Sequence, residues 1–104
     1  MKIAIASVSK DKNSNISEVA GRSKYYFIFD KSGEFLEVIN NPFSVGGGGA
    51  GYGVAKMMAD KNVSTIVAEK FGPKMIDAMD ERKLTYLTGT GKISDFISDM
   101  LGKK

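Results

Sequence analysis

Residues 63–87, VSTIVAEKFGPKMIDAMDERKLTYL, read as a strand, a helix and a second strand in succession. The run Val63–Ala68 predicts a buried strand, and residues 84–87 predict a short one. Gly72 and Pro73 open the helix between them, because a proline at the first helical position removes no donor that the helix needs. A helical crossover makes its two flanking strands parallel, with a right-handed connection. The stretch therefore predicts an α/β fold.

The N-terminal half adds three more strands. Ile3, Ala4, Ile5, Ala6 and Val8 form an apolar run that only Ser7 interrupts, which is typical of a strand covered on both faces. Residues 25–29 and 35–39 are two strands joined by a turn at residues 31–34, so they predict an antiparallel hairpin. Residues 9–18 are polar and irregular and predict a long loop.

Apolar stripes at helical spacing predict two further helices, one after the hairpin and one at the C-terminus. Their members are Ala50, Val54, Met57 and Met58 in the first, and Ile93, Phe96, Ile97, Met100 and Leu101 in the second, which Gly102 closes. The order is thus βββαβαβα. It predicts a mixed five-stranded sheet with helices on its faces, in one domain spanning residues 1–104.

Composition excludes several kinds of chemistry. The 104 residues include no Cys and no His, which rules out disulfides, Cys/His zinc sites, thiol catalysis and His-dependent triads. No apolar run approaches a membrane span and the N-terminus is too short for a secretory signal, so we expect a soluble cytoplasmic protein with no membrane partner. The absence of Gln, Cys and His beside 13 Lys also fits the composition of a thermophile.

The net charge of +3 comes mainly from scattered lysines, with only two Arg. Nucleic-acid binders cluster their cations and use Arg prominently, so we expect no nucleic-acid partner. No catalytic constellation stands out either, because Ser7 and Ser9 have no His to activate them. Asp30 and Glu69 fall near strand ends, where two carboxylates can share a metal, but acids at strand ends are more often ordinary turn residues. We therefore expect a protein that is not an enzyme.

Residues 46–53, GGGGAGYG, are the most unusual stretch. Backbone amides without side chains that lead into a helix N-terminus suit an anion. Gly46, Gly48 and Gly51 formally satisfy G-x-G-x-x-G, but a run of glycines satisfies almost any glycine pattern, and this one follows the third strand rather than the first. No Lys-Ser or Lys-Thr follows, so a P-loop is excluded. The alternative is a structural loop that needs positive φ and close packing.

Three segments resemble one known family. Residues 19–30, VAGRSKYYFIFD, resemble its HFGRA-x-YF…D segment; Asn41-Pro42 followed by residues 46–53 resembles its NP…GGGxG segment; and Phe71-Gly72-Pro73-Lys74 resembles its (I/F)-G-P-x-A helix start. The family is the dinitrogenase iron–molybdenum cofactor biosynthesis group, the NifX-like domain that also occurs at the C-terminus of NifB proteins. The similarity covers nearly the whole chain.

This resemblance implies a ribonuclease H-like three-layer fold, in agreement with the βββαβαβα order. It also implies that the protein binds or carries an iron–sulfur-type metallocluster during cofactor assembly, with a protein partner in that assembly, and is not catalytic. Where many members have His, this chain has Val19-Ala20, and the His or Cys that can flank the glycine loop is missing. A cluster would therefore be held by backbone N–H groups, by Tyr or carboxylate oxygens, or by Lys and Arg, without Cys or His ligands.

We accordingly expect an anionic cofactor or cluster on the glycine loop, with the 9–22 loop as the opposite wall. The expected site residues are Gly46, Gly47, Gly48, Gly49, Gly51, Arg22 and Ser9. Two alternatives remain open: a protein–protein adaptor whose glycine loop is purely structural, and a nucleotide- or phosphate-binding module that uses the same loop.

Overall fold

The computed structural model describes residues 1–45 and 49–101. These residues form five strands, three α-helices and one short 3-10 helix, and every strand and helix expected from the sequence is present. In chain order they are β1 (Lys2–Ser7), η1 (Ala20–Arg22), β2 (Tyr25–Asp30), β3 (Phe35–Asn40), α1 (Ala50–Asp60), β4 (Val63–Ala68), α2 (Pro73–Glu81), β5 (Thr85–Thr88) and α3 (Ile93–Met100).

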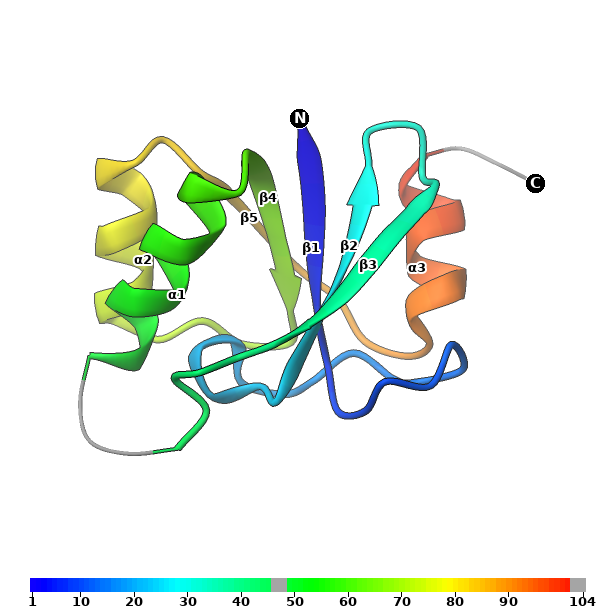
Figure 1. Ribbon diagram of the computed structural model, residues 1–104, viewed down its shortest axis with the longest axis horizontal. Helices are drawn as coiled ribbons and strands as arrows, with labels where there is room; N and C mark the ends of the chain where they lie inside the picture. The colour runs from blue at the N-terminus through cyan, green and yellow to red at the C-terminus, as the bar shows by residue number, and fades with distance from the viewer. Residues whose placement is uncertain (46–48, 102–104) are drawn as a thin grey trace.

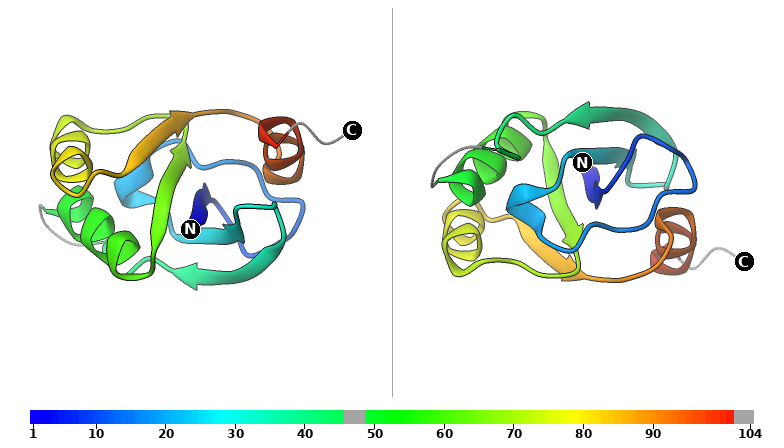
Figure 2. Two further views of the ribbon diagram at one scale, coloured as in Figure 1. Left: turned by 90° about the horizontal axis from the view of Figure 1, so that it is seen from above. Right: turned by 90° about the horizontal axis from the view of Figure 1, so that it is seen from below.

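The strands form one mixed sheet in the order β3-β2-β1-β4-β5. β1 pairs antiparallel with β2 and β2 with β3, whereas β1 pairs parallel with β4 and β4 with β5. Figure 1 shows α1 and α2 on one face of the sheet and α3 on the other; Figure 2 shows the same three layers end-on. The arrangement is the ribonuclease H-like three-layer fold that the resemblance implied.

Alternation along the central strands divides the core into two clusters. Ala4 and Ala6 of β1 face α1 and α2, with Tyr26 and Ile28 of β2 beside them. Ile3 and Ile5 point to the opposite face, where they pack against Phe27, Phe29 and α3. Successive side chains of a strand point to opposite faces, so a central strand covered on both sides must be apolar throughout, as predicted for β1. The strand ends at Ser7, and the next residue, Val8, is 55% exposed.

The β2–β3 turn is held by Asp30. Its carboxylate Oδ1 accepts hydrogen bonds from the Ser32 hydroxyl at 2.6 Å and from the backbone N–H groups of Ser32 and Glu34 at 2.9 and 3.0 Å. These bonds, led by the one from the Ser32 hydroxyl, hold the pKa of Asp30 below its ordinary value. Gly33 completes the turn with a φ of 93°, a conformation that favours glycine.

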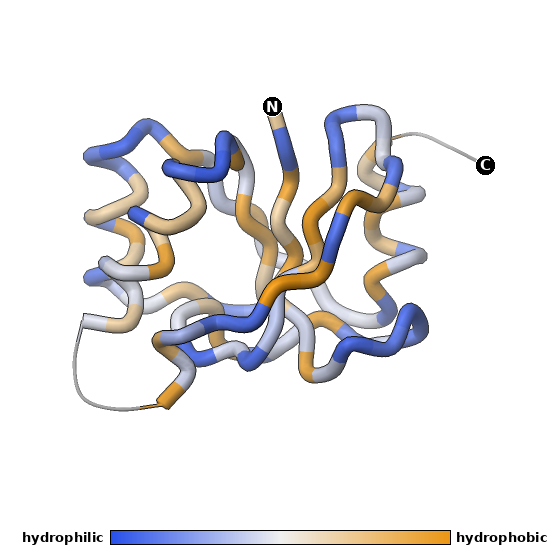
Figure 3. Tube along the Cα trace, in the orientation of Figure 1, coloured by the Kyte–Doolittle hydropathy of each residue, from blue (hydrophilic) through white to orange (hydrophobic). Residues whose placement is uncertain are grey.

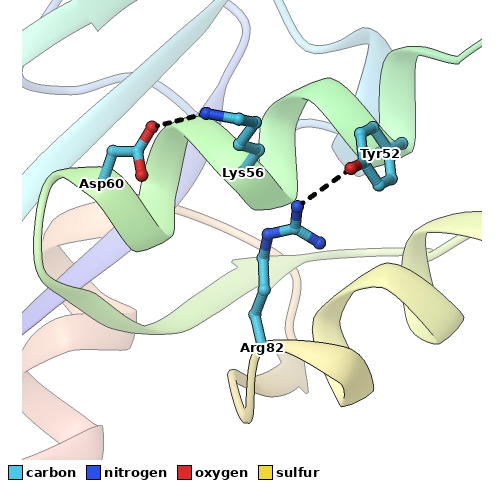
Figure 4. A network of polar contacts seen from close by, with 4 residues as sticks. All are labelled: Tyr52, Lys56, Asp60 and Arg82. Carbon is cyan, nitrogen blue, oxygen red and sulfur yellow. Dashed lines mark hydrogen bonds and ion pairs between the residues drawn. The ribbon is translucent and has the colours of Figure 1, made fainter.

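The two helices on the same face are tied together where α2 ends. The Arg82 guanidinium lies 4.7 Å from the centroid of the Tyr52 ring, and one of its nitrogens donates a hydrogen bond to the Tyr52 hydroxyl at 3.2 Å (Figure 4). Lys56 and Asp60 form an i, i+4 ion pair of 3.1 Å along the exposed side of α1. An exposed pair within one helix contributes little stability and does not join α1 to α2. Buried apolar residues of both helices instead pack in one cluster. Within the described part of the chain, no helix is long and apolar enough to cross a membrane.

Candidate functional site

All three α-helices begin at the same end of the sheet (Figure 1). The parallel strands β1, β4 and β5 finish at this end, and so does β3. The segments that follow β3, β4 and β5 lead into α1, α2 and α3. In open α/β sheets, ligands bind outside the carboxyl ends of the strands, because the loops and helix N-termini gather there. Of the residues expected in the site, those that the structure describes lie at this end.

Glycines allow three segments to meet closely at this end. A Cβ on Gly51, in the first turn of α1, would lie 2.6 Å from the Cβ of Met75 in α2. A Cβ on Gly21, in η1, would lie 3.3 Å from the backbone nitrogen of Gly51. Gly49 precedes α1 with a φ of +87°, which a side chain would strain. Gly51 and Gly21 therefore serve the close approach of α1, α2 and η1, which gives part of the glycine pattern a structural reason.

Buried polar groups fix η1 in place. The Tyr26 hydroxyl, fully buried in the core, donates a hydrogen bond to the carbonyl of Ala20. Asn41 donates through its side-chain amide to the carbonyls of Gly21 and Ser23, at 3.1 and 2.7 Å. No buried side-chain polar atom among the described residues is left without a partner. Hydrogen bonds from Tyr26 of β2 and from Asn41, just after β3, therefore hold η1 in place.

Arg22 leaves this anchored turn toward solvent. Its Nη1 donates to the carbonyl of Phe43 at 3.4 Å, which joins η1 to the segment leading into the glycine loop. On the other side of η1, the N–H of Ala20 donates to the Lys70 carbonyl at 3.1 Å, and the Lys70 side chain lies 3.6 Å from Glu18. The turn thus bridges the segments that lead into α1 and α2.

An open pocket of about 330 Å³ lies between these segments. It is lined from η1 by Gly21 and Arg22 and from the segments that begin the two helices, and its full lining is Val19, Gly21, Arg22, Gly49, Ala50, Gly51, Gly72, Pro73, Lys74 and Met75. Its size is within the range of small-molecule sites, and we call it the α1–α2 pocket.

The pocket has two helix N-termini in its wall. Neither α1 nor α2 has a side-chain cap, and neither has an acidic residue in its first turn. The first N–H groups of a helix have no partner within the helix, and the helix dipole places partial positive charge there. Arg22 and Lys74 add two full charges to the same lining. This combination favours an anion.

Positive charge is also in excess over the whole of this end of the molecule. Its described segments, residues 8–24, 40–45, 49, 69–74 and 89–92, contain seven basic side chains and three acidic ones. This excess of four positive charges compares with a net +3 for the entire chain. An anionic ligand would therefore be attracted to this end in preference to the opposite one.

The structure brings together some of the predicted site residues and separates others. Gly49, Gly51 and Arg22 line the α1–α2 pocket. Ser9 does not; its hydroxyl accepts a hydrogen bond from the N–H of Asp11 at 3.1 Å and so stabilises a turn in the long loop. The predictions for Gly46, Gly47 and Gly48 lie outside the described residues.

Seven of the ten lining residues were not expected in the site, and Gly72 and Lys74 are two of them. Gly72 and Lys74 were assigned only to a helix start, although a helix that begins just after a strand of a parallel pair already indicates the ligand-binding end of the sheet. Asp30 and Glu69 do not meet: Asp30 pairs with Lys2 at the start of β1, whereas Glu69 follows the carboxyl end of β4, which runs parallel to β1. Within residues 1–45 and 49–101, no group of three or more acidic, His or Cys side chains could hold a metal ion.

The fold and the pocket define a three-layer α/β protein of the ribonuclease H-like kind, with a cationic pocket at the carboxyl ends of its parallel strands. A family model described as "Dinitrogenase iron-molybdenum cofactor" matches residues 1–103, and the chain therefore belongs to this family. None of the curated protein sequences matches the chain.

Three solved structures share the fold. The crystal structure of PH0822 has a TM-score of 0.82 at 25% identity and covers 98% of this chain and 91% of that one. The NMR structure of TM1290 from Thermotoga, described as a candidate NifB protein of the DUF35 family, has a TM-score of 0.78 at 25% identity, with 97% and 86% covered. The apo form of the orange protein from Desulfovibrio gigas has a TM-score of 0.87 at 16% identity, with 97% and 87% covered, and so shows the fold alone.

Proposed function

We propose that this protein is a non-catalytic carrier that binds an anionic metallocluster, of the iron–sulfur type, in the α1–α2 pocket during cofactor assembly. The observation that carries the proposal is the convergence of two uncapped helix N-termini with Arg22 and Lys74 on one pocket. Membership of the dinitrogenase iron–molybdenum cofactor family supports a metallocluster over other anions.

The donor set determines how such a cluster would be held. The described residues offer no Cys, no His and no group of acids with which to ligate iron or molybdenum. Backbone N–H groups and the Arg22 and Lys74 side chains can instead donate hydrogen bonds to the sulfur or oxygen atoms on the outside of an anionic cluster. Binding of this kind leaves the metal's own ligands in place. It therefore suits a cargo that must be released to a partner protein.

Gly72 offers a direct test because it lines the pocket and precedes α2. A Cβ there would meet no atom within 4 Å, and its backbone (φ −72°, ψ 154°) is open to any residue. Asp and Asn at this position both cap the helix, but only Asp adds negative charge to the pocket. Gly72→Asp and Gly72→Asn are therefore a matched pair that separates charge from shape.

The experiment is anaerobic incubation of each protein with a synthetic thiolate-capped iron–sulfur cluster, followed by gel filtration and iron analysis. We expect iron to co-elute with the wild type and with Gly72→Asn, and Gly72→Asp to bind about tenfold more weakly than Gly72→Asn, equivalent to about 1.4 kcal/mol. Equal binding by the two variants, or no iron on the wild-type protein, would contradict the proposal.

Parallel titrations with inorganic phosphate and with ATP show whether a phosphate-bearing ligand is preferred; tighter binding of either would favour the nucleotide- or phosphate-binding alternative.

A further inference from the structure

β3 lies at one margin of the sheet, and no strand among the described residues pairs with its outer edge (Figure 2). Two of its large apolar side chains face solvent: Phe35 is 46% exposed and Leu36 is 44% exposed. Figure 3 shows hydrophobic residues along this exposed strand. β5, at the other margin, has only four residues. An edge of six residues with exposed apolar side chains can pair with another strand.

The pairing with β2 fixes which backbone groups of β3 remain available. The N–H of Asn41 donates to the carbonyl of Lys24, so residue 41 directs its backbone groups toward β2. In an antiparallel ladder, hydrogen-bonded pairs alternate with pairs that are not hydrogen-bonded. The backbone groups of Ile39 and Glu37 therefore also face β2, and those of Val38 and Asn40 face outward.

We propose that two copies of this chain pair through β3, antiparallel and across a two-fold axis at Val38, to form a continuous ten-stranded sheet. Placing Val38 opposite Val38 of the second copy aligns the outward-facing N–H and C=O groups of the two strands at the axis. It sets Asn40 opposite Leu36 of the second copy, where β3 has a register shift between its pairs with Ile28 and Phe29. A register centred on Glu37 fails on two counts: its backbone groups already face β2, and two like charges would lie opposite each other.

The two ends of the strand carry complementary charges in this register, and Glu37 of each copy lies diagonally across from Glu37 of the other. Glu34 lies at the start of β3, and Lys24 lies beside its end, next to Asn41; both are exposed. Both also lie on the α1–α2 side of the sheet, because Glu34 pairs with Asp30 and Lys24 comes two residues before Tyr26. Antiparallel pairing sets Glu34 of each copy two strand spacings, about 10 Å between backbones, from Lys24 of the other. Their side chains can span this separation.

This pattern favours a second copy over an unrelated peptide as the occupant. Any extended peptide could use the outward-facing backbone groups of β3, but the match of an acidic end with a basic end, repeated by the two-fold axis, is a property of the chain paired with itself. The proposal does not depend on what the α1–α2 pocket binds.

The test is sedimentation equilibrium from about 1 μM to about 1 mM, a range that covers weak homodimers. We expect a concentration-dependent shift toward the mass of two copies. Val38→Pro removes an outward-facing N–H, which an edge strand tolerates, and should raise the dissociation constant about tenfold because two symmetric hydrogen bonds are lost. Circular dichroism checks that this variant is folded.

A charge exchange keeps the proposal testable if Val38→Pro does not fold. Lys24→Glu and Glu34→Lys should each raise the dissociation constant about fivefold, since each places two like-charged pairs across the axis. The double variant should restore wild-type association. A mass of one copy at every concentration would overturn the proposal and leave the edge to a different partner. Association that neither Val38→Pro nor the single charge variants weaken would overturn it as well, because another surface would then be responsible.

Discussion

The hydroxyl of Tyr26 shows how one buried atom positions the candidate site. Tyr26 is fully buried between the sheet and α1, and its hydroxyl donates to the Ala20 carbonyl of η1. The same carbonyl also accepts a long hydrogen bond, of 3.5 Å, from the Ser23 N–H. Gly21 and Arg22, which line the pocket, follow directly, so the orientation of this wall of the pocket depends on the core of the sheet.

Tyr26→Phe should therefore destabilise the fold by about 1–3 kcal/mol, because it leaves a buried carbonyl with one weak partner. The measurement is urea unfolding monitored by circular dichroism. Tyr25→Phe is the matched control, since Tyr25 lies next to it on the same strand and is partly exposed. Equal stability of the Tyr26→Phe variant and the wild type would mean that the hydroxyl does not hold η1.

The same residue predicts a response to alkaline pH. Burial raises the pKa of Tyr26 far above its ordinary value of about 10. The contribution of the neutral Tyr26 phenol to the free energy of unfolding is fully present below about pH 10. It is lost as pH rises further, because the unfolded chain then ionises the phenol while the native protein does not. Above that pH the wild type should lose about 1.4 kcal/mol of stability per pH unit from this group, whereas the Tyr26→Phe variant should not. The stability gap between the two proteins should accordingly narrow between about pH 9 and about pH 11; a gap that stays constant would contradict this account.

At the scale of the elements, α1 and α2 pack closely because Gly51 has no side chain where α1 faces Met75 of α2. A Cβ on Gly51 would lie 2.6 Å from the Cβ and 3.0 Å from the Cα of Met75, both too close for a real contact. In an ordinary helix Gly→Ala stabilises by up to about 1 kcal/mol. Here Gly51→Ala should destabilise by about 1–3 kcal/mol, because the two helices must separate.

Gly72→Ala is the control for this change, since a Cβ at that position meets nothing within 4 Å. Its stability should stay within about 0.5 kcal/mol of the wild type. Thermal unfolding of the two variants side by side decides the point. A Gly51→Ala protein as stable as the wild type would show that the helices do not approach as closely as the structure has them.

The elements themselves could be predicted from the sequence because periodicity is a local property. The two hairpin strands with the turn between them, the helical stripe of Val54 and Met58, and the proline that opens α2 each indicated the correct element. η1 was not predicted, because its shape depends on side-chain hydrogen bonds from Tyr26, six residues beyond Ala20, and from Asn41, 20 residues beyond Gly21, rather than on a local pattern. The glycine pattern pointed to the end of the molecule that contains the α1–α2 pocket. It could not reveal that Gly51 is required by Met75, a contact that exists only after α1 and α2 have packed.

At the scale of the whole molecule, the positive ends of the helix dipoles and an excess of basic side chains lie at the same end. The parallel strands require all three helices to start there, so their dipoles add in one direction. The basic side chains of the loops at that end outnumber the acidic ones by four. The opposite end contains the helix C-termini, where Lys61 follows α1. An anionic ligand should therefore be bound by the field of the whole end as well as by its direct contacts.

This polarity predicts how binding of the thiolate-capped cluster depends on salt. Raising NaCl from about 0.05 M to about 0.5 M shortens the screening length from about 14 Å to about 4 Å, so affinity should fall severalfold even though the direct contacts remain.

Lys74→Gln removes a charge that lines the pocket and should weaken binding about tenfold at low salt, with a smaller dependence on salt than the wild type. Lys61→Gln makes the same change in net charge at the opposite end and should leave the affinity within about twofold, because solvent and salt screen its distance from the pocket. Equal losses in the two variants would show that only the net charge of the chain matters, and that the α1–α2 pocket is not where the anion binds.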